Sequence, residues 1–238
     1  IRRIIDYCAL NNLVYITKSS ELDDVESEKT DESAPGTWSL MQCFEGHNIV
    51  KIRTGSEHTL FLQDNGSVWC VGDNTFGQCG ETEDEEDERV AVPMEVEFFK
   101  QNGVCIVDIE CGLYHNLAVS KERRVYSWGH AKRGQCGNGE ADVEEEYIER
   151  PHFIEYFESN KLKVKKIACG NYHSLVATTK DEYYLFGSNK YHQCLCFDEQ
   201  RQTVVSPFCV NEIVQQQTKA KHIKDIYLGC NNTKIIVY

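Results

Sequence analysis

The sequence predicts an all-β protein assembled from repeats of one antiparallel sheet. Three observations support this fold class: landmarks that recur at a nearly constant period, short apolar runs joined by turn residues, and no 3.6-residue period of helical length. The exception is a possible short helical turn around residues 210–217. A unit of this kind cannot bury both faces of its own sheet, so the repeats must pack on one another.

The first landmark is a Gly-x-x-His element that precedes an apolar run. Its glycines are Gly55, Gly112, Gly170 and Gly229, so the period lengthens by only one position from each copy to the next. The histidine is present three times, and Asn232 replaces it in the last copy. Chance does not keep such an element in phase over three periods, so these residues predict consecutive structural units.

A hairpin follows the first landmark in each unit. In the best copy, the run Leu60–Leu62 leads through Asp64-Asn65-Gly66 into Val68–Val71. An Asn-Gly pair between two apolar runs predicts a type I′ turn, whose two central residues both have positive φ. Trp69 and Val71 are two residues apart and so share one face of the second strand.

Two further landmarks keep the same rhythm. The second is a strand that ends in glycine, at 68–72, 125–129 and 183–187, where we expect the backbone to turn or to approach a neighbour closely. The third is Gly-Gln-Cys-Gly at 77–80 and 134–137, which decays to His192-Gln193-Cys194-Leu195. Radial stacking into a β-propeller is the usual arrangement for units of this kind.

These three landmarks resemble the repeat of the regulator of chromosome condensation family. The resemblance covers residues 50–238 and is specific in three repeats. It implies a β-propeller, since the family forms seven-bladed rings. The sequence departs from the family pattern at Cys79 and Cys136, where the family usually has leucine, and at Asn232.

The chain is expected to be a single β-propeller segment over residues 1–238. We divide it into a partial repeat with an acidic loop (1–49), three repeats (50–107, 108–165 and 166–224) and a half repeat (225–238). The two partial units could join into a fourth unit that closes a ring, or they could be the ends of an arc of a larger ring. We favour the arc. Because the chain begins with Ile1, we also expect it to be part of a longer multidomain protein.

Composition and cysteine spacing indicate in which cellular compartment the protein is found. The chain has no run of 18 apolar residues and no signal-peptide pattern, so no contact with a membrane is expected. Its 12 cysteines include no Cys-x-x-Cys pair, and several stand where a small hydrophobic residue would serve. Reduced structural thiols are therefore favoured over disulfides or a metal site. This favours an intracellular location, in the cytoplasm or the nucleus.

No catalytic or cofactor site is predicted. The sequence holds no nucleophile elbow, phosphate loop or zinc-protease motif, so we expect no enzyme and no cofactor. His58, His115 and His173 raise a metal hypothesis, but equivalent residues of a radial array sit on different blades. Each histidine is instead expected to satisfy backbone groups of its own unit, with help from Thr59 or Ser174. Trp69 and Trp128 stand at core positions and predict no ligand cage.

Acidic residues gather in three stretches of the chain. Of the 38 Asp and Glu residues, seven lie in 19–32, seven in 81–88 and six in 140–149, which accounts for 20. These stretches share one phase of the repeat, so they should emerge on one side of consecutive blades. The simple interpretation is a set of solubilising, self-repelling loops. The sharper hypothesis is an acidic rim that attracts a basic protein. Its candidate binding residues are Glu83, Asp84, Glu85, Glu86, Asp87, Glu88, Glu144, Glu145 and Glu146.

Two functions remain under consideration. The first is a non-catalytic interaction scaffold that binds a protein partner, which under the acidic-rim hypothesis is a basic protein. The alternative, which the family resemblance implies, is guanine-nucleotide exchange on a Ran-like small GTPase, although no exchange residue can be transferred to this sequence. No nucleic-acid partner is expected, because the lysines at 161–165 and 219–224 are few and stand against a net charge of −13.

Overall fold

The computed structural model describes residues 7–10, 13–17, 38–40, 44, 48–80, 88–139, 146–198 and 200–238. Each unit is an antiparallel sheet in which consecutive strands pair, and we call the five sheets blades 1 to 5. Blade 1 contains β1 (Tyr7–Leu10), β2 (Leu13–Thr17) and β3 (Trp38–Leu40). Blade 5 contains β16 (Ile223–Leu228) and β17 (Thr233–Val237).

Blades 2 to 4 are complete four-stranded sheets. Blade 2 consists of β4 (Ile49–Thr54), β5 (His58–Gln63), β6 (Val68–Asp73) and β7 (Arg89–Glu95). Blade 3 consists of β8 (Ile106–Cys111), β9 (His115–Ser120), β10 (Val125–His130) and β11 (Tyr147–Phe153). Blade 4 consists of β12 (Val164–Cys169), β13 (His173–Thr178), β14 (Tyr183–Ser188) and β15 (Thr203–Cys209). The all-β prediction is confirmed.

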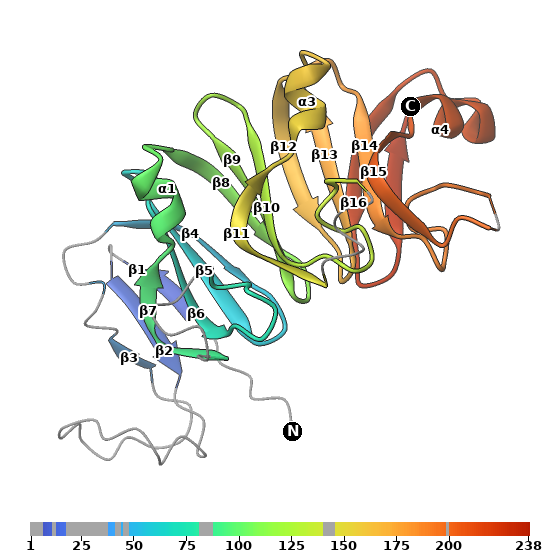
Figure 1. Ribbon diagram of the computed structural model, residues 1–238. Helices are drawn as coiled ribbons and strands as arrows, with labels where there is room; N and C mark the ends of the chain where they lie inside the picture. The colour runs from blue at the N-terminus through green and yellow to red at the C-terminus, as the bar shows by residue number, and fades with distance from the viewer. Residues whose placement is uncertain are drawn as a thin grey trace.

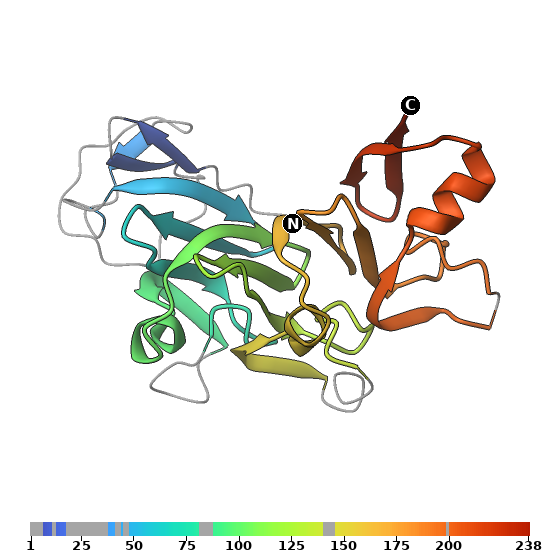
Figure 2. The same ribbon diagram turned by 90° about the horizontal axis from the view of Figure 1, so that it is seen from above.

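The blades fan out as an open arc. Figure 2 shows blade 1 in blue and blade 5 in dark red at the two ends of the arc. In the described residues β16 and β17 pair only with each other, and the strands of blade 1 form a separate sheet. The described strands thus form a partial propeller, in which the two partial units stand in separate sheets and do not join into one closing blade.

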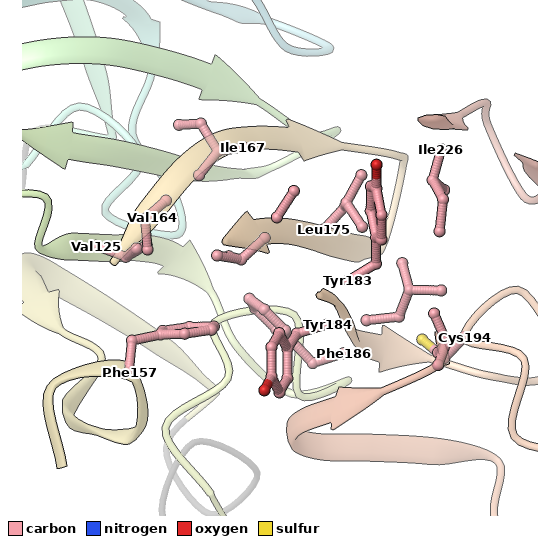
Figure 3. Close-up of a cluster of buried hydrophobic side chains, with 14 of the residues drawn as sticks. Val125, Phe157, Val164, Ile167, Leu175, Tyr183, Tyr184, Phe186, Cys194 and Ile226 are labelled. Carbon is pink, nitrogen blue, oxygen red and sulfur yellow. The ribbon is translucent and has the colours of Figure 1, made fainter. Parts of the chain in front are cut away.

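The second strand of each complete blade lies at the centre of the packing. All six residues of β5, of β9 and of β13 are buried, because each of these strands is covered on both faces by neighbouring blades. Figure 3 shows one such interface, where Val125 of blade 3, Leu175 of blade 4 and Ile226 of blade 5 belong to one continuous core.

The hairpin between β5 and β6 is confirmed, but the type I′ turn is wrong. Only Gly66 has a positive φ, of 91°, and Asn65 does not. The amide of Gly66 donates to the carbonyl of Gln63, whose own amide donates to the carbonyl of Ser67. This is a type I turn that ends in one left-handed residue. Arg123 and Asp181 take the same left-handed position in blades 3 and 4.

Short helices connect each complete blade to the next. They are α1 (Glu97–Gln101), α3 (Glu155–Ser159) and α4 (Asn211–Thr218), and they lie along one side of the arc (Figure 1). Only the last was predicted, because five residues are too few to display a helical period. The first two each insert a buried phenylalanine, Phe99 or Phe157, between blades.

Charged residues tie the first strands of neighbouring blades. Lys51 of β4 pairs with Asp108 and Glu110 of β8, and Arg53 adds a contact of 3.0 Å to Glu110. Lys166 of β12 lies 2.7 Å from Asp225 of β16. These half-buried pairs join side chains that are about one repeat apart in the sequence, so basic residues on β4 and β12 alternate with acidic residues on β8 and β16.

Candidate protein-interaction face

One end of the blades collects the repeat landmarks. It is formed by the turns at 55–57, 112–114, 170–172 and 229–232 and by the described parts of three connections, which are 74–80 with 88, 131–139 with 146, and 189–198 with 200–202. The helices α1, α3 and α4 lie at the opposite end (Figure 1). Antiparallel pairing places these turns and connections together, because the second strand starts where the third strand ends. We call this end the turn face.

Backbone hydrogen bonds run from blade to blade across the turn face. The amide of Ser56 donates to the carbonyl of Leu113 at 2.9 Å, Leu113 donates to Asn171 at 3.0 Å, and Asn171 donates to Cys230 at 3.0 Å. The first-landmark glycines permit this approach. A Cβ on Gly112 would lie 2.8 Å from the carbonyl oxygen of Gly170 and 2.0 Å from Cε1 of His115.

The three histidines link neighbouring blades. His58 Nε2 lies 2.8 Å from Asn116 Oδ1, His115 Nε2 lies 2.9 Å from Ser174 Oγ, and His173 Nε2 lies 3.4 Å from Thr233 Oγ1. In each case the partner belongs to the next blade. There it directly follows that blade's own first-landmark histidine, or Asn232, which replaces the histidine in blade 5. The expectation of bonds within the histidine's own unit was therefore wrong, although Ser174 does take part.

Each partner side chain makes a second hydrogen bond that defines the proton positions. Asn116 Nδ2 donates to the carbonyl of Gln78, Ser174 Oγ to that of Gln135, and Thr233 Oγ1 to that of Gln193. Because the two hydroxyls give their proton to these carbonyls, they accept one from the histidine, as Asn116 Oδ1 does. The histidines are therefore protonated on Nε2. We call each histidine, partner and carbonyl an inter-blade latch.

Burial keeps the latch histidines neutral. It lowers the pKa of His58 and of His173 to about 4, and that of His115 to about 3. Burial also raises the pKa of the Cys111 and Cys194 thiols, which makes them poor nucleophiles. Among the described residues no three His, Cys, Asp or Glu side chains are grouped to hold a metal ion.

The Gly-Gln-Cys-Gly landmark shapes the connection that carries each latch carbonyl. Gln78 Oε1 accepts from the amide of Phe76 at 2.9 Å, and Gln135 and Gln193 repeat this bond with Arg133 and Tyr191. In the decayed copy, His192 and Leu195 replace the two glycines and keep positive φ values of 56° and 58°. The loop conformation is therefore retained where its sequence signature is lost.

One cysteine expectation is wrong. Cys70 of β6 and Cys79 of the Gly-Gln-Cys-Gly loop form a disulfide, whereas we expected reduced thiols. The loop folds back over β6 and brings the two sulfurs together. Blade 3 replaces this contact by a hydrogen bond of 2.8 Å from Ser127 Oγ to the carbonyl of Cys136. The eight other cysteines whose side chains the structure describes are free.

The acidic candidates can be placed only in part. Glu88 and Glu146 are exposed and belong to the connections of the turn face. The other seven candidates lie outside the described residues: Glu83, Asp84, Glu85, Glu86, Asp87, Glu144 and Glu145. The described residues add two exposed acids to this end of blades 2 and 3, Glu57 in the first turn and Glu149 near the start of β11.

A row of stacked side chains, which sequence reasoning missed, crosses the turn face. Phe76 packs edge-on against Tyr114 at 5.5 Å and against His130 at 4.9 Å, and Tyr114 lies 6.3 Å from Tyr172. The guanidinium of Arg133 stands 4.1 Å from the centre of the Tyr172 ring. We call these five residues the stacked row. The row could have been found from the sequence, because its residues keep a constant phase of the repeat. Phe76 and Arg133 are one full period apart, and so are Tyr114 and Tyr172.

The hollow on the surface of the described residues offers no catalytic group. A hollow of about 430 Å³ lies along β11 and is lined by residues 146–150, which include no nucleophile beside a base. No helix in the part of the chain that the structure describes is both long and apolar enough to cross a membrane.

The fold and the latches define a repeat β-propeller in which blades 2 to 5 are joined by side chains at equivalent positions of the repeat. The family model of the regulator of chromosome condensation (RCC1) repeat matches residues 65–119 and 124–177, and a second model of this repeat matches 49–78, 106–135 and 164–193. The chain therefore belongs to the RCC1 repeat family.

Individual relatives agree with this assignment. The human E3 ubiquitin-protein ligase HERC2 is 30% identical over 165 residues, which is 68% of this chain and 3% of HERC2. Yeast RCC1 (Prp20), solved bound to Kap60, superposes with a TM-score of 0.71 and 22% identity over 95% of this chain and 50% of that one. Another structure of Prp20p from Saccharomyces cerevisiae gives 0.58 and 19%, over 94% and 63%. At these identities the structures show the fold alone.

Proposed function

We propose that this chain is a non-catalytic interaction propeller that binds a basic protein partner through the turn face. One observation carries the proposal: the half-buried rings of the stacked row and the exposed carboxylates of Glu57, Glu88, Glu146 and Glu149 occupy the same end of consecutive blades. Aromatic side chains supply contact area at interfaces, and surrounding carboxylates attract a cationic partner and accelerate its association.

The context of the propeller belongs to this proposal as well. The chain spans only 3% of HERC2, so the ligase activity in that name is not transferred to it. We propose an intracellular, multidomain setting in which other parts of the protein act on what the propeller holds. The Prp20p structure that was described with its binding properties to Gsp1p and histones gives support from a protein of the same fold.

Two measurements test the proposal: the salt dependence of peptide binding, and the effect of removing four negative charges at one end of the blades or at the other. Fluorescein-labelled octalysine is titrated with the protein between 50 and 300 mM NaCl, and binding is followed by fluorescence anisotropy. We expect affinity to fall steeply with salt, because the attraction is screened. Neutralising the rim at four positions (Glu85→Gln, Glu86→Gln, Asp87→Asn, Glu88→Gln) should weaken binding at least tenfold.

A matched variant controls for net charge. Glu97, Glu122, Glu155 and Glu212 lie at the opposite end of the blades, and their replacement by Gln removes the same four charges. This variant should bind octalysine within twofold of the unaltered chain. Binding that does not respond to salt, or equal losses in both variants, would exclude the acidic rim as the attracting surface.

Guanine-nucleotide exchange on a small GTPase is the second candidate. The observation that favours it is the shared fold with yeast RCC1 over 95% of this chain. A panel of small GTPases loaded with fluorescent GDP is incubated with the propeller at substoichiometric concentration. Accelerated release would establish exchange, whereas stable capture of a partner without release would favour the scaffold.

A further inference from the structure

The stacked row follows a rule that relates two neighbouring blades. The residue just before the Gly-Gln pair of one blade covers the ring just before the histidine of the next blade. Phe76 covers Tyr114 in this way, and Arg133 covers Tyr172. The same position is thus filled once by an aromatic ring and once by a guanidinium.

The contact between Arg133 and Tyr172 shows that a guanidinium can stack on the Tyr172 ring. Its guanidinium lies 4.1 Å from the ring centre, which is within the range of a cation–π contact. The backbone of Arg133 is held by its amide, which donates to Gln135 Oε1 at 2.9 Å. Its side chain is exposed and can turn away without disturbing the loop.

The charges around the row favour a cation. Glu57 occupies the position of Tyr114 and Tyr172 in blade 2, and the bond from Ser56 to Leu113 holds its turn beside that of Tyr114. Burial lowers the pKa of His130, so this ring is neutral at pH 7 and adds no positive charge. Of the nearby lysines, Lys132 is already paired with Glu146 at 2.8 Å.

We propose that Tyr114 and Tyr172 form a binding site for arginine side chains of a protein partner, with Glu57 as the neighbouring carboxylate and Arg133 as an internal occupant that the partner displaces. The planar guanidinium stacks on a ring face, whereas the ammonium of lysine is a compact and strongly hydrated charge. The site should therefore distinguish arginine from lysine at equal charge. This inference rests on the proposed function, because it names the chemistry of the basic partner.

Two labelled peptides of equal charge, octa-arginine and octalysine, test the site by fluorescence anisotropy at 150 mM NaCl. We expect octa-arginine to bind about tenfold more tightly. The double change Tyr114→Ala, Tyr172→Ala should remove most of this preference and change octalysine binding by less than twofold. Tyr172→Phe keeps the ring face and should keep the preference.

A second variant does not depend on the integrity of the tyrosines. Arg133→Lys keeps the charge but stacks less well, so it should strengthen octa-arginine binding about two- to threefold and leave octalysine unchanged. The control is Tyr227→Ala on β16, because Tyr227 is 49% exposed and carries Lys166 at 4.6 Å over its ring. It should change neither affinity, and thermal melting verifies that each variant is folded.

The outcomes separate the two proposals. If both peptides bind equally and both lose affinity in the rim variant, the arginine site is wrong and the acidic rim stands. If neither peptide binds, both proposals are overturned. A preference for arginine that survives the double tyrosine change would also overturn the site.

Discussion

The Nε2 atom of His58 lies 2.8 Å from Oδ1 of Asn116, so a histidine of blade 2 is held by a side chain of blade 3. The same amide group reaches the carbonyl of Gln78 at 2.7 Å, which returns the contact to blade 2. Blades 2 and 3 are thus joined at two points through one buried side chain, and equivalent latches join blade 3 to blade 4 and blade 4 to blade 5. Repetition of this latch explains why the Gly-x-x-His and Gly-Gln landmarks recur together.

Removing a latch partner should destabilise the propeller. Asn116→Ala leaves His58 Nε2 without its partner and removes one donor from the Gln78 carbonyl. That carbonyl still accepts a hydrogen bond of 3.0 Å from the indole N–H of Trp128. We expect a loss of about 2–3 kcal/mol in the free energy of unfolding. Urea denaturation measures it. The control Asn102→Ala removes an exposed side-chain hydrogen bond to the Phe98 carbonyl and should cost less than about 1 kcal/mol. Equal losses in the two variants would show that the latch does not stabilise the propeller.

The latch histidines should make stability depend on pH. Their pKa values in the folded chain, about 4, 3 and 4, lie below the usual 6.5, so the unfolded chain binds more protons as the pH falls. Stability should be complete above pH 6.5 and decline from there toward pH 4, by about 1.4 kcal/mol per pH unit for each histidine.

A single substitution isolates this effect. His115→Asn introduces the residue that Asn232 already supplies in blade 5, and should reduce the slope of stability against pH by about a third. His152→Gln changes an exposed side chain and should leave the slope intact. Urea midpoints between pH 7.5 and 4.5 provide the data. An unaltered slope in His115→Asn would show that the buried imidazole does not control acid sensitivity.

The glycine of the first landmark should be intolerant of any side chain. Gly112→Ala would place Cβ 2.0 Å from Cε1 of His115, so the ring and the neighbouring turn must move. We expect a loss of at least about 3 kcal/mol, comparable to an overpacked core. Gly103→Ala is the matched change, since nothing lies within 4 Å of its Cβ and only its φ of 63° is unfavourable.

That comparison separates crowding from backbone strain. Gly103→Ala should cost only about 1 kcal/mol, the usual penalty for a left-handed residue with a side chain. Thermal or urea unfolding of both variants gives the two values. If Gly112→Ala is no worse than Gly103→Ala, close packing between turns is not the reason for the repeated glycine.

The short helix α1 should act as a wedge between blades. Phe99 is 2% exposed and lies 5.6 Å from the Tyr126 ring and 5.7 Å from that of Trp128. Phe99→Ala should therefore cost about 3–5 kcal/mol, the range for a buried aromatic residue. Phe98→Ala removes a half-buried ring of the same helix and should cost clearly less. Equal costs, measured by urea denaturation, would show that α1 is only a connector.

Several parts of the structure could be predicted because they repeat. The phase of Gly55, His58 and Gln78 defines one unit, and three copies in phase require sheets that pack on one another. The helices α1 and α3 escaped prediction because such short segments show no period, although Phe99 and Phe157 recur at one phase of the repeat. The turn at Asn65-Gly66 was assigned the wrong type, since Asp64 extends it by one residue and Asn65 stays out of the left-handed region.

By itself the sequence determined the class of fold, the repeat length and the residues that each unit needs, because these features are local and recur at a fixed phase. Only the tertiary structure decided what those residues touch. His58 bonds to blade 3 rather than to its own unit, and Phe76 and Arg133 each cover a ring that belongs to the following blade. Such contacts depend on how far each blade rotates and approaches the next, and that geometry arises only when all the interfaces pack at once.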